Sequence, residues 1–196
     1  MASAAILVGG AGRRYGGHDK SALIVEGRAI LDRQLEALAC LTDDILLVGR
    51  RPEDAPPGAR AVLDRTPGLG PLGGLDAALT AARDEHLLLL ACDMPFVSTD
   101  LLRYLLSLAP EADAVVPRTD RGYHPLCAVY ARACHATVTR RLAHGELKMT
   151  ALLDEVRVRA VDRQEMARVG DVERLLANVN TPADFDRIAT RLGHTR

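Results

Sequence analysis

Residues 4–20 read AAILVGGAGRRYGGHDK, an apolar run followed by a loop rich in glycines and cations. The run Ala4–Val8 is short and continuous, which is typical of a buried strand in a parallel sheet. The next twelve residues contain five glycines and the three cations Arg13, Arg14 and Lys20. Glycines let backbone N–H groups approach an anion closely, and the cations add full positive charge. The stretch therefore predicts a phosphate-binding loop after the first strand of an α/β fold.

Two better-known phosphate-binding loops do not match this stretch. A P-loop carries Gly directly before its Lys, whereas Asp19 precedes Lys20 here. The dinucleotide fingerprint GxGxxG would begin at Gly10, but Tyr15 stands where its third glycine belongs. The sequence therefore disfavours a nicotinamide-dependent dehydrogenase.

Strand and helix patterns alternate along the first half of the chain. Apolar runs predict strands over Ala4–Val8, Asp44–Val48, Arg60–Leu63, His86–Ala91, Ala112–Val116 and Leu126–Tyr130, and an edge strand over Val156–Val161. Helical spacing and capping residues predict helices over Ile30–Leu41, Leu72–Ala82, Ser98–Leu108, Arg132–Ala143 and Thr181–Leu192. This alternation indicates a parallel sheet covered by helices on both faces, with ligands beyond the carboxyl ends of the strands.

Acidic residues follow two of these strands. Asp93 comes just after the strongest predicted strand, which has four consecutive leucines, and a carboxylate there suits a Mg²⁺ ion that also holds phosphate oxygens. Asp64 follows the third strand in the same way, and Gly70 opens a glycine-rich helix entry. The competing interpretation is that all three are ordinary turn or capping residues.

Composition limits the function classes. Lys and Arg number 25 and Asp and Glu 26, so the chain lacks the basic excess of a general nucleic-acid binder. We find no apolar run near the roughly 20 residues that span a bilayer, and no signal-peptide pattern. The four cysteines form no CxxC pair and predict buried free thiols in a reducing compartment, and the histidine spacing does not suit zinc. We therefore expect a single cytoplasmic domain over residues 1–196.

Several motifs together resemble the molybdenum cofactor guanylyltransferase family. Leu7–Gly16 with Lys20 is similar to the family signature LAGGxxxRMGxxK, with Val8 in place of Ala and Tyr15 in place of Met. Further matches follow in order at Gly70-Pro71-Leu72, Cys92-Asp93-Met94-Pro95, Tyr123-His124-Pro125 and Asn178-Val179-Asn180-Thr181-Pro182. The resemblance covers nearly the whole chain.

The resemblance implies a fold, ligands and partners. The fold would be three-layer α/β/α with a mostly parallel, Rossmann-like sheet, as in nucleotide-diphospho-sugar transferases. GTP and molybdopterin would be the substrates and Mg²⁺ the cofactor, with the nucleotide bound by the N-terminal half and the acceptor by the C-terminal half. The product would pass to molybdoenzymes or cofactor-delivery proteins.

The resemblance also implies roles for individual residues. The expected nucleotide contacts are Leu7, Val8, Gly9, Gly10, Gly12, Arg14, Lys20, Asp64, Gly70 and Asp93. Lys20, Asp93 and Arg13 are the expected catalytic residues, with Asp93 as the metal ligand. His124, Asn178 and Asn180 are expected on the acceptor side.

The expected reaction is transfer of GMP from GTP to molybdopterin with release of pyrophosphate. A phosphate nucleophile is already ionised at neutral pH, which suits a sequence without a Ser/His/Asp arrangement. Three alternatives stay open from the residues: a cytidylyltransferase for the same cofactor, a sugar-1-phosphate nucleotidyltransferase, and a non-catalytic nucleotide sensor.

Overall fold

A central eight-stranded sheet organises the computed structural model, which describes residues 1–8, 23–63, 68–179 and 184. The strand order is β10-β7-β9-β6-β1-β4-β5, and β8 pairs with β7. The strands are β1 (Ala2–Leu7), β4 (Ile45–Val48), β5 (Arg60–Val62), β6 (His86–Ala91), β7 (Ala114–Thr119), β8 (Gly122–Tyr123), β9 (Cys127–Ala131) and β10 (Val158–Val161). Neighbours in the β6-β1-β4-β5 series pair in parallel, as do β10 and β7. β9 runs antiparallel to both of its neighbours, β6 and β7.

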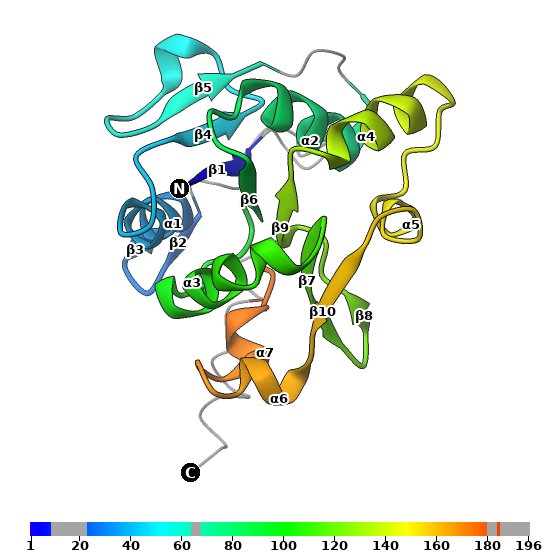
Figure 1. The fold of residues 1–196 in the computed structure, drawn as a ribbon. Helices are drawn as coiled ribbons and strands as arrows, with labels where there is room; N and C mark the ends of the chain where they lie inside the picture. Colours follow the sequence, from blue (N-terminus) through cyan, green and yellow to red (C-terminus); the bar gives the residue numbers. More distant parts are fainter. Residues whose placement is uncertain (9–22, 64–67, 180–183, 185–196) are drawn as a thin grey trace.

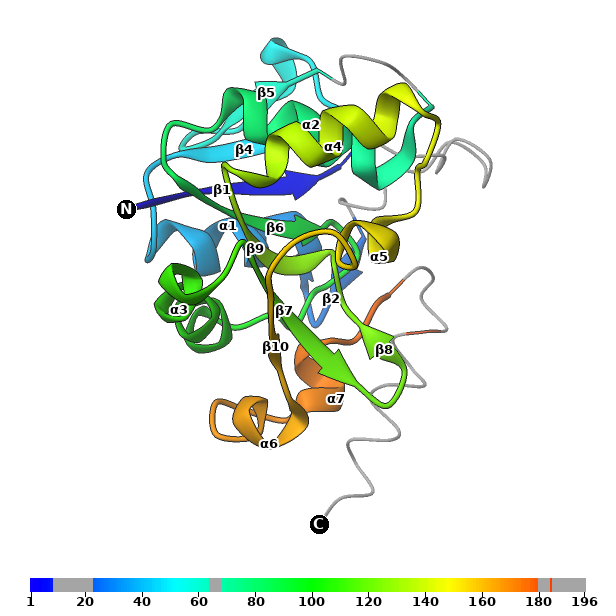
Figure 2. The ribbon, with the colours of Figure 1, turned by 45° about the vertical axis from the view of Figure 1, so that its right-hand side comes forward.

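Helices cover both faces of this sheet (Figures 1 and 2). One face carries α1 (Ile30–Ala39) and α3 (Thr99–Ser107), and the other carries α2 (Gly70–Ala81) and α4 (Cys134–Ala143). Alternate side chains of β6 divide accordingly, since Leu88 and Leu90 pack on the first face and Leu87 and Leu89 on the second. The three-layer α/β/α prediction, with a mostly parallel sheet, is therefore confirmed.

The predicted bounds of several elements shift. α2 begins at Gly70 rather than Leu72, because Pro71 is well suited to the first turn of a helix. Ser98 caps α3 as expected, since its side chain accepts a hydrogen bond from the N–H of Leu101.

Cys40 is exposed, which corrects the expectation that the thiols are buried, whereas Cys127 and Cys134 are buried.

The sequence patterns do not predict the shortest elements of the structure. They are the β2 (Ile24–Val25) and β3 (Arg28–Ala29) hairpin, the four-residue helices α5 (Met149–Leu152), α6 (Arg163–Met166) and α7 (Val172–Leu175), and two 3₁₀ turns at Pro52–Asp54 and Ala109–Glu111. Each is too short to establish a helical or strand period. The helix expected from Thr181 lies outside the described residues. In the described part of the chain, every helix is too short or too polar to cross a bilayer.

A buried carboxylate fastens the amino-terminal edge of the sheet. Asp44 is 2% exposed and precedes β4. It accepts hydrogen bonds from the Ser3 hydroxyl at 2.6 Å, from Nε of Arg60 at 2.8 Å and from the N–H of Arg83 at 3.1 Å. Burial alone would raise the pKa of Asp44, but these donors outweigh burial and hold the pKa below its ordinary value of 3.8.

Replacing Asp44 with alanine tests this anchor. We expect the free energy of unfolding to fall by about 2 kcal/mol, less than for a fully buried ion pair because Arg60 is partly exposed. A lowered folded pKa stabilises the protein above pH 3.8 and loses this effect as the pH falls toward the folded pKa. Urea unfolding should therefore separate wild type from variant at pH 7 and bring them together in stronger acid. Equal urea midpoints at pH 7 would contradict the assignment.

Candidate active site at the carboxyl edge of the sheet

The first strands of the sheet end level with one another. Leu7 of β1 stands opposite Val48 of β4 and opposite Ala91 of β6, and Val48 stands opposite Val62 of β5. The chain runs from β1 outward to β4 and β5 and then returns to β6 on the other side of β1. The chain thus continues from β1 to a strand on one side of the adjacent pair β1 and β6, and from β6 to a strand on the other side. This switch point is where open α/β sheets bind ligands.

The structure places part of the predicted nucleotide set at this edge. Leu7 ends β1, Val8 follows it, and Asp93 lies two residues beyond the end of β6. Gly70 opens α2 with a φ of 63°, a backbone conformation that favours glycine. Eight further predicted site residues lie outside the described residues. They are Gly9, Gly10, Gly12, Arg13, Arg14, Lys20, Asp64 and Asn180.

A buried glutamine holds the turn that carries Asp93. Gln34 of α1 is fully buried, and its side-chain amide donates to the carbonyl of Ala91 at 2.7 Å and to that of Met94 at 3.1 Å. These two carbonyls flank Asp93 in the chain. The amide therefore fixes the backbone on both sides of the carboxylate, whose Oδ1 atom is shielded from solvent.

A glycine brings the start of α2 close to the end of β1. A Cβ atom on Gly74 would lie 2.9 Å from Cδ2 of Leu7, closer than side-chain packing allows. The segment Gly70–Gly74 thus forms the helix entry that the sequence predicts, and contact of Gly70 with a nucleotide stays a prediction.

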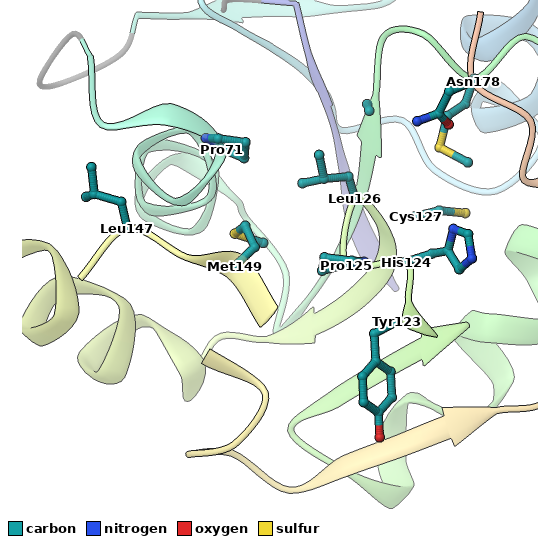
Figure 3. A pocket seen from close by; sticks show the side chains of 11 residues that line it. Pro71, Tyr123, His124, Pro125, Leu126, Cys127, Leu147, Met149 and Asn178 are labelled. Atoms are coloured by element: carbon teal, nitrogen blue, oxygen red, sulfur yellow. The ribbon is translucent and has the colours of Figure 1, made fainter. Parts of the chain in front are cut away.

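A cavity of about 350 Å³ opens beside this edge (Figure 3). Its lining residues come from five parts of the chain: Pro71, Ala91, Met94, Tyr123, His124, Pro125, Leu126, Cys127, Leu147, Met149 and Asn178. His124 and Asn178 lie on one side, and Leu147 and Met149 lie on the other. The N–H of Val179 donates to the carbonyl of Asp93 at 2.7 Å, so the segment that carries Asn178 is bonded to the Asp93 turn. The structure thus brings two predicted acceptor residues together next to Asp93.

Comparison with known proteins identifies this arrangement. Residues 4–162 match the model of the MobA-like NTP transferase domain. This chain belongs to that family. A molybdenum cofactor guanylyltransferase of Desulfosudis oleivorans is 32% identical over 93% of this chain and 91% of its own length. A probable molybdenum cofactor guanylyltransferase of Pelotomaculum thermopropionicum is 34% identical over 94% of this chain and 90% of its own.

A solved structure agrees with these relatives. Molybdopterin-guanine dinucleotide biosynthesis protein A of Archaeoglobus fulgidus superposes with a TM-score of 0.81 and 26% identity, covering 98% of this chain and 99% of that one. The MobA-like chain described here is therefore a nucleotidyltransferase.

Burial shifts the pKa values of two titratable side chains in the MobA-like cavity, His124 and Cys127. Burial lowers the pKa of His124, and the nearby charge of Arg121 lowers it further. The Nε2 atom of His124 lies 2.9 Å from the Thr119 hydroxyl, which holds the ring in place. Burial raises the pKa of the Cys127 thiol to about 12, so this thiol stays protonated and is a poor nucleophile. Both side chains suit binding rather than covalent chemistry.

Sequence reasoning missed Gln34, Leu147 and Met149. Gln34 carried a usable signal, because it lies between Leu31 and Leu38 on the apolar face of the predicted helix. A polar residue on such a face needs buried hydrogen-bond partners. Leu147 and Met149 carried no comparable signal, since only the path of the chain after α4 brings them to the cavity.

Gln34→Leu tests how this MobA-like enzyme holds the Asp93 turn. Leucine fills a similar volume but donates no hydrogen bond, so we expect the free energy of unfolding to fall by about 2 kcal/mol. Turnover of the variant that remains folded should fall about ten-fold, because the carboxylate is less firmly positioned. Asp32→Asn, at an exposed position of the same helix, is the control. Thermal melting and initial rates measure both effects, and wild-type turnover in Gln34→Leu would refute the role.

Proposed function

We infer that this enzyme transfers GMP from GTP to the molybdenum cofactor, forms molybdopterin guanine dinucleotide and releases pyrophosphate. The family match and the guanylyltransferase relatives support this activity over nearly the full chain. The hydrogen bond from Val179 to Asp93 is the observation that carries it, because it joins the acceptor segment to the strand end where a nucleotide would bind. On this proposal the enzyme works in the cytoplasm and passes its product to molybdoenzymes or delivery proteins.

The two halves of the chain divide the substrates. Leu7, Val8 and Gly70 would bound the nucleotide at the switch point, together with Asp64 and the signature residues Gly9, Gly10, Gly12, Arg13, Arg14 and Lys20. Lys20 and the two arginines would neutralise the β- and γ-phosphates, where negative charge grows as pyrophosphate leaves. His124, Asn178 and Asn180 would hold the acceptor.

The cavity has the character of an acceptor site. Its volume of about 350 Å³ falls at the lower end of the range for small-molecule pockets. Leu126, Leu147 and Met149 supply apolar walls against which a flat ring system can pack. His124 and Asn178 supply polar atoms that can bond the heteroatoms of such a ring.

The reaction needs positioning more than proton transfer. An oxygen of the cofactor's terminal phosphate forms a bond to the α-phosphorus of GTP, and the bond from that phosphorus to the pyrophosphate oxygen breaks. Because the nucleophile is already ionised, no side chain has to remove a proton. The work left to the protein is to hold two anions in line, which the fixed strand ends and the anchored Asp93 turn suit.

The residues at this edge fit a magnesium ion. Mg²⁺ is usually held by one or two carboxylates together with substrate phosphates and water. Asp93 offers one carboxylate at the strand end, and the described residues contain no cluster of three or more His, Cys, Asp or Glu that would form a closed cage. Bound there, the ion would offset the negative charge of the phosphates. Asp93 would hold it, and Gln34 would keep Asp93 in place.

A nucleotide comparison tests the activity. Purified enzyme is given the molybdenum cofactor, Mg²⁺ and one of GTP, CTP or ATP, and pyrophosphate release is measured. We expect turnover with GTP to exceed turnover with the other two by at least about 100-fold, since a site that bonds one base leaves buried polar groups unpaired with another. Preference for CTP would indicate a cytidylyltransferase. Turnover with a sugar 1-phosphate instead of the cofactor would indicate the sugar-nucleotide reaction, and tight GTP binding without turnover would indicate a sensor.

Asp93→Asn tests the metal-binding role. Asparagine keeps the shape of the side chain but removes its charge, so we expect kcat to fall about 10²- to 10³-fold while the melting temperature changes little. Asp154→Asn, at an exposed position after α5, controls for the loss of one negative charge. Full turnover by Asp93→Asn at saturating Mg²⁺ would remove Asp93 from the mechanism.

A further inference from the structure

The β2–β3 hairpin has an unfavourable residue at its tip. Val25 pairs with Arg28, which leaves Glu26 and Gly27 as a two-residue turn. Both have positive φ, 49° for Glu26 and 76° for Gly27, as a type I′ turn requires. Glycine accepts this conformation, whereas glutamate is strained in it, and asparagine would be favoured at that position. A strained residue of this kind points to a purpose for its side chain.

The Glu26 carboxylate joins two distant elements. One oxygen lies 3.0 Å from Nη2 of Arg33 in α1, and the other lies 3.0 Å from Nη2 of Arg174 in α7. Arg33 also donates to the carbonyl of Val25 at 2.8 Å. The hairpin is thus fastened to the helix that follows it and to a helix near the other end of the described chain. Figure 2 shows α7 below this hairpin.

Arg174 connects the Glu26 ion pair to the candidate active site. Its guanidinium lies over the ring of Phe96 at 4.5 Å from the centroid. Phe96 packs in one apolar cluster with Val25, Ile30 and Val179. The cluster therefore joins the hairpin after the signature loop, the turn after Asp93 and the segment of Asn178. The Glu26–Arg174 ion pair, the contact of Arg174 with Phe96 and the apolar cluster together connect these three segments.

We propose that Glu26 is a positioning residue, which holds α7 and the Ala177–Val179 segment against the hairpin so that Asn178 faces the acceptor. This role rests on the proposed function, because it concerns the acceptor side of the same site. Arg174 lies four residues before Asn178, so a shift of α7 is passed directly along the chain. Glu26 itself lines no part of the cavity in the described structure and acts through Arg174.

Stability alone does not account for Glu26. The side chains of Glu26 and Arg174 are 40% and 43% exposed, so their ion pair contributes little to folding, and the pair with Arg33, which is 20% exposed, fastens the hairpin to α1 only. Asparagine would also relieve the strain of the turn. A purely structural role therefore predicts that Glu26→Asn is neutral or stabilising and leaves the kinetics unchanged.

Glu26→Asn separates positioning from stability. We expect the KM for the molybdenum cofactor to rise about five-fold, with the KM for GTP and the melting temperature little changed. Glu36→Asn is the matched control, because the Glu36–Arg28 pair also fastens this hairpin to α1 but does not reach α7. A rise of the acceptor KM in Glu26→Asn and not in Glu36→Asn supports the proposal. An unchanged acceptor KM in Glu26→Asn overturns it.

A second variant tests the route through Arg174. If Glu26 acts through that arginine, Arg174→Gln should raise the acceptor KM by itself but add little in the Glu26→Asn background. Fully multiplicative effects of the two substitutions would show that they act independently, which would overturn the proposed route.

Hydrogen exchange tests the positioning without catalysis. The Val179 amide is bonded to the carbonyl of Asp93, so its exchange reports how firmly the segment is held. We expect faster exchange at Val179 in Glu26→Asn than in wild type or Glu36→Asn, in free enzyme. Absence of GMP transfer by wild type would refute the proposed function alone, whereas unchanged Val179 exchange would refute the role of Glu26 alone.

Discussion

The level carboxyl ends of β1, β4 and β6 are the constraint on which the rest of the structure depends. Leu7, Val48 and Ala91 lie side by side in register, so the chain leaves three strands at one edge. The Asp93 turn follows β6 at that edge, next to the end of β1. Gln34 completes the constraint from the helix layer, because it binds the backbone on both sides of Asp93. The candidate site thus depends on hydrogen bonds within the protein itself.

The sequence predicts the layers of the fold well because the core strands are continuous and apolar. His86–Ala91 is buried on both faces, and a run of four leucines indicates this without ambiguity. The direction of β9 could not be predicted, because an apolar run has the same pattern in a parallel and an antiparallel strand. Helices of a single turn such as α7 also leave no period to detect.

The site was predictable in its chemistry and less so in its geometry. Asp93, His124 and Asn178 were singled out from residue types and motif resemblance, and the structure brings His124 and Asn178 to one cavity next to the Asp93 turn. Their convergence depends on strand order, which single motifs do not encode. The loop of Lys20 and the residue Asn180 lie outside the described residues, so their roles stay predictions. The sequence does not single out Glu26, because only its positive φ shows that its backbone conformation is unfavourable for glutamate.

The antiparallel strand β9 limits how this chain can be divided into fragments. It comes from the second half of the chain, yet it lies between β6 and β7 and covers the open edge of the first-half sheet. A fragment that ended after α3 would expose β6, which carries four consecutive leucines, as a free edge prone to pair with other chains. The first half of the chain is therefore an unsuitable stand-alone unit, because its sheet is completed by a strand from the second half.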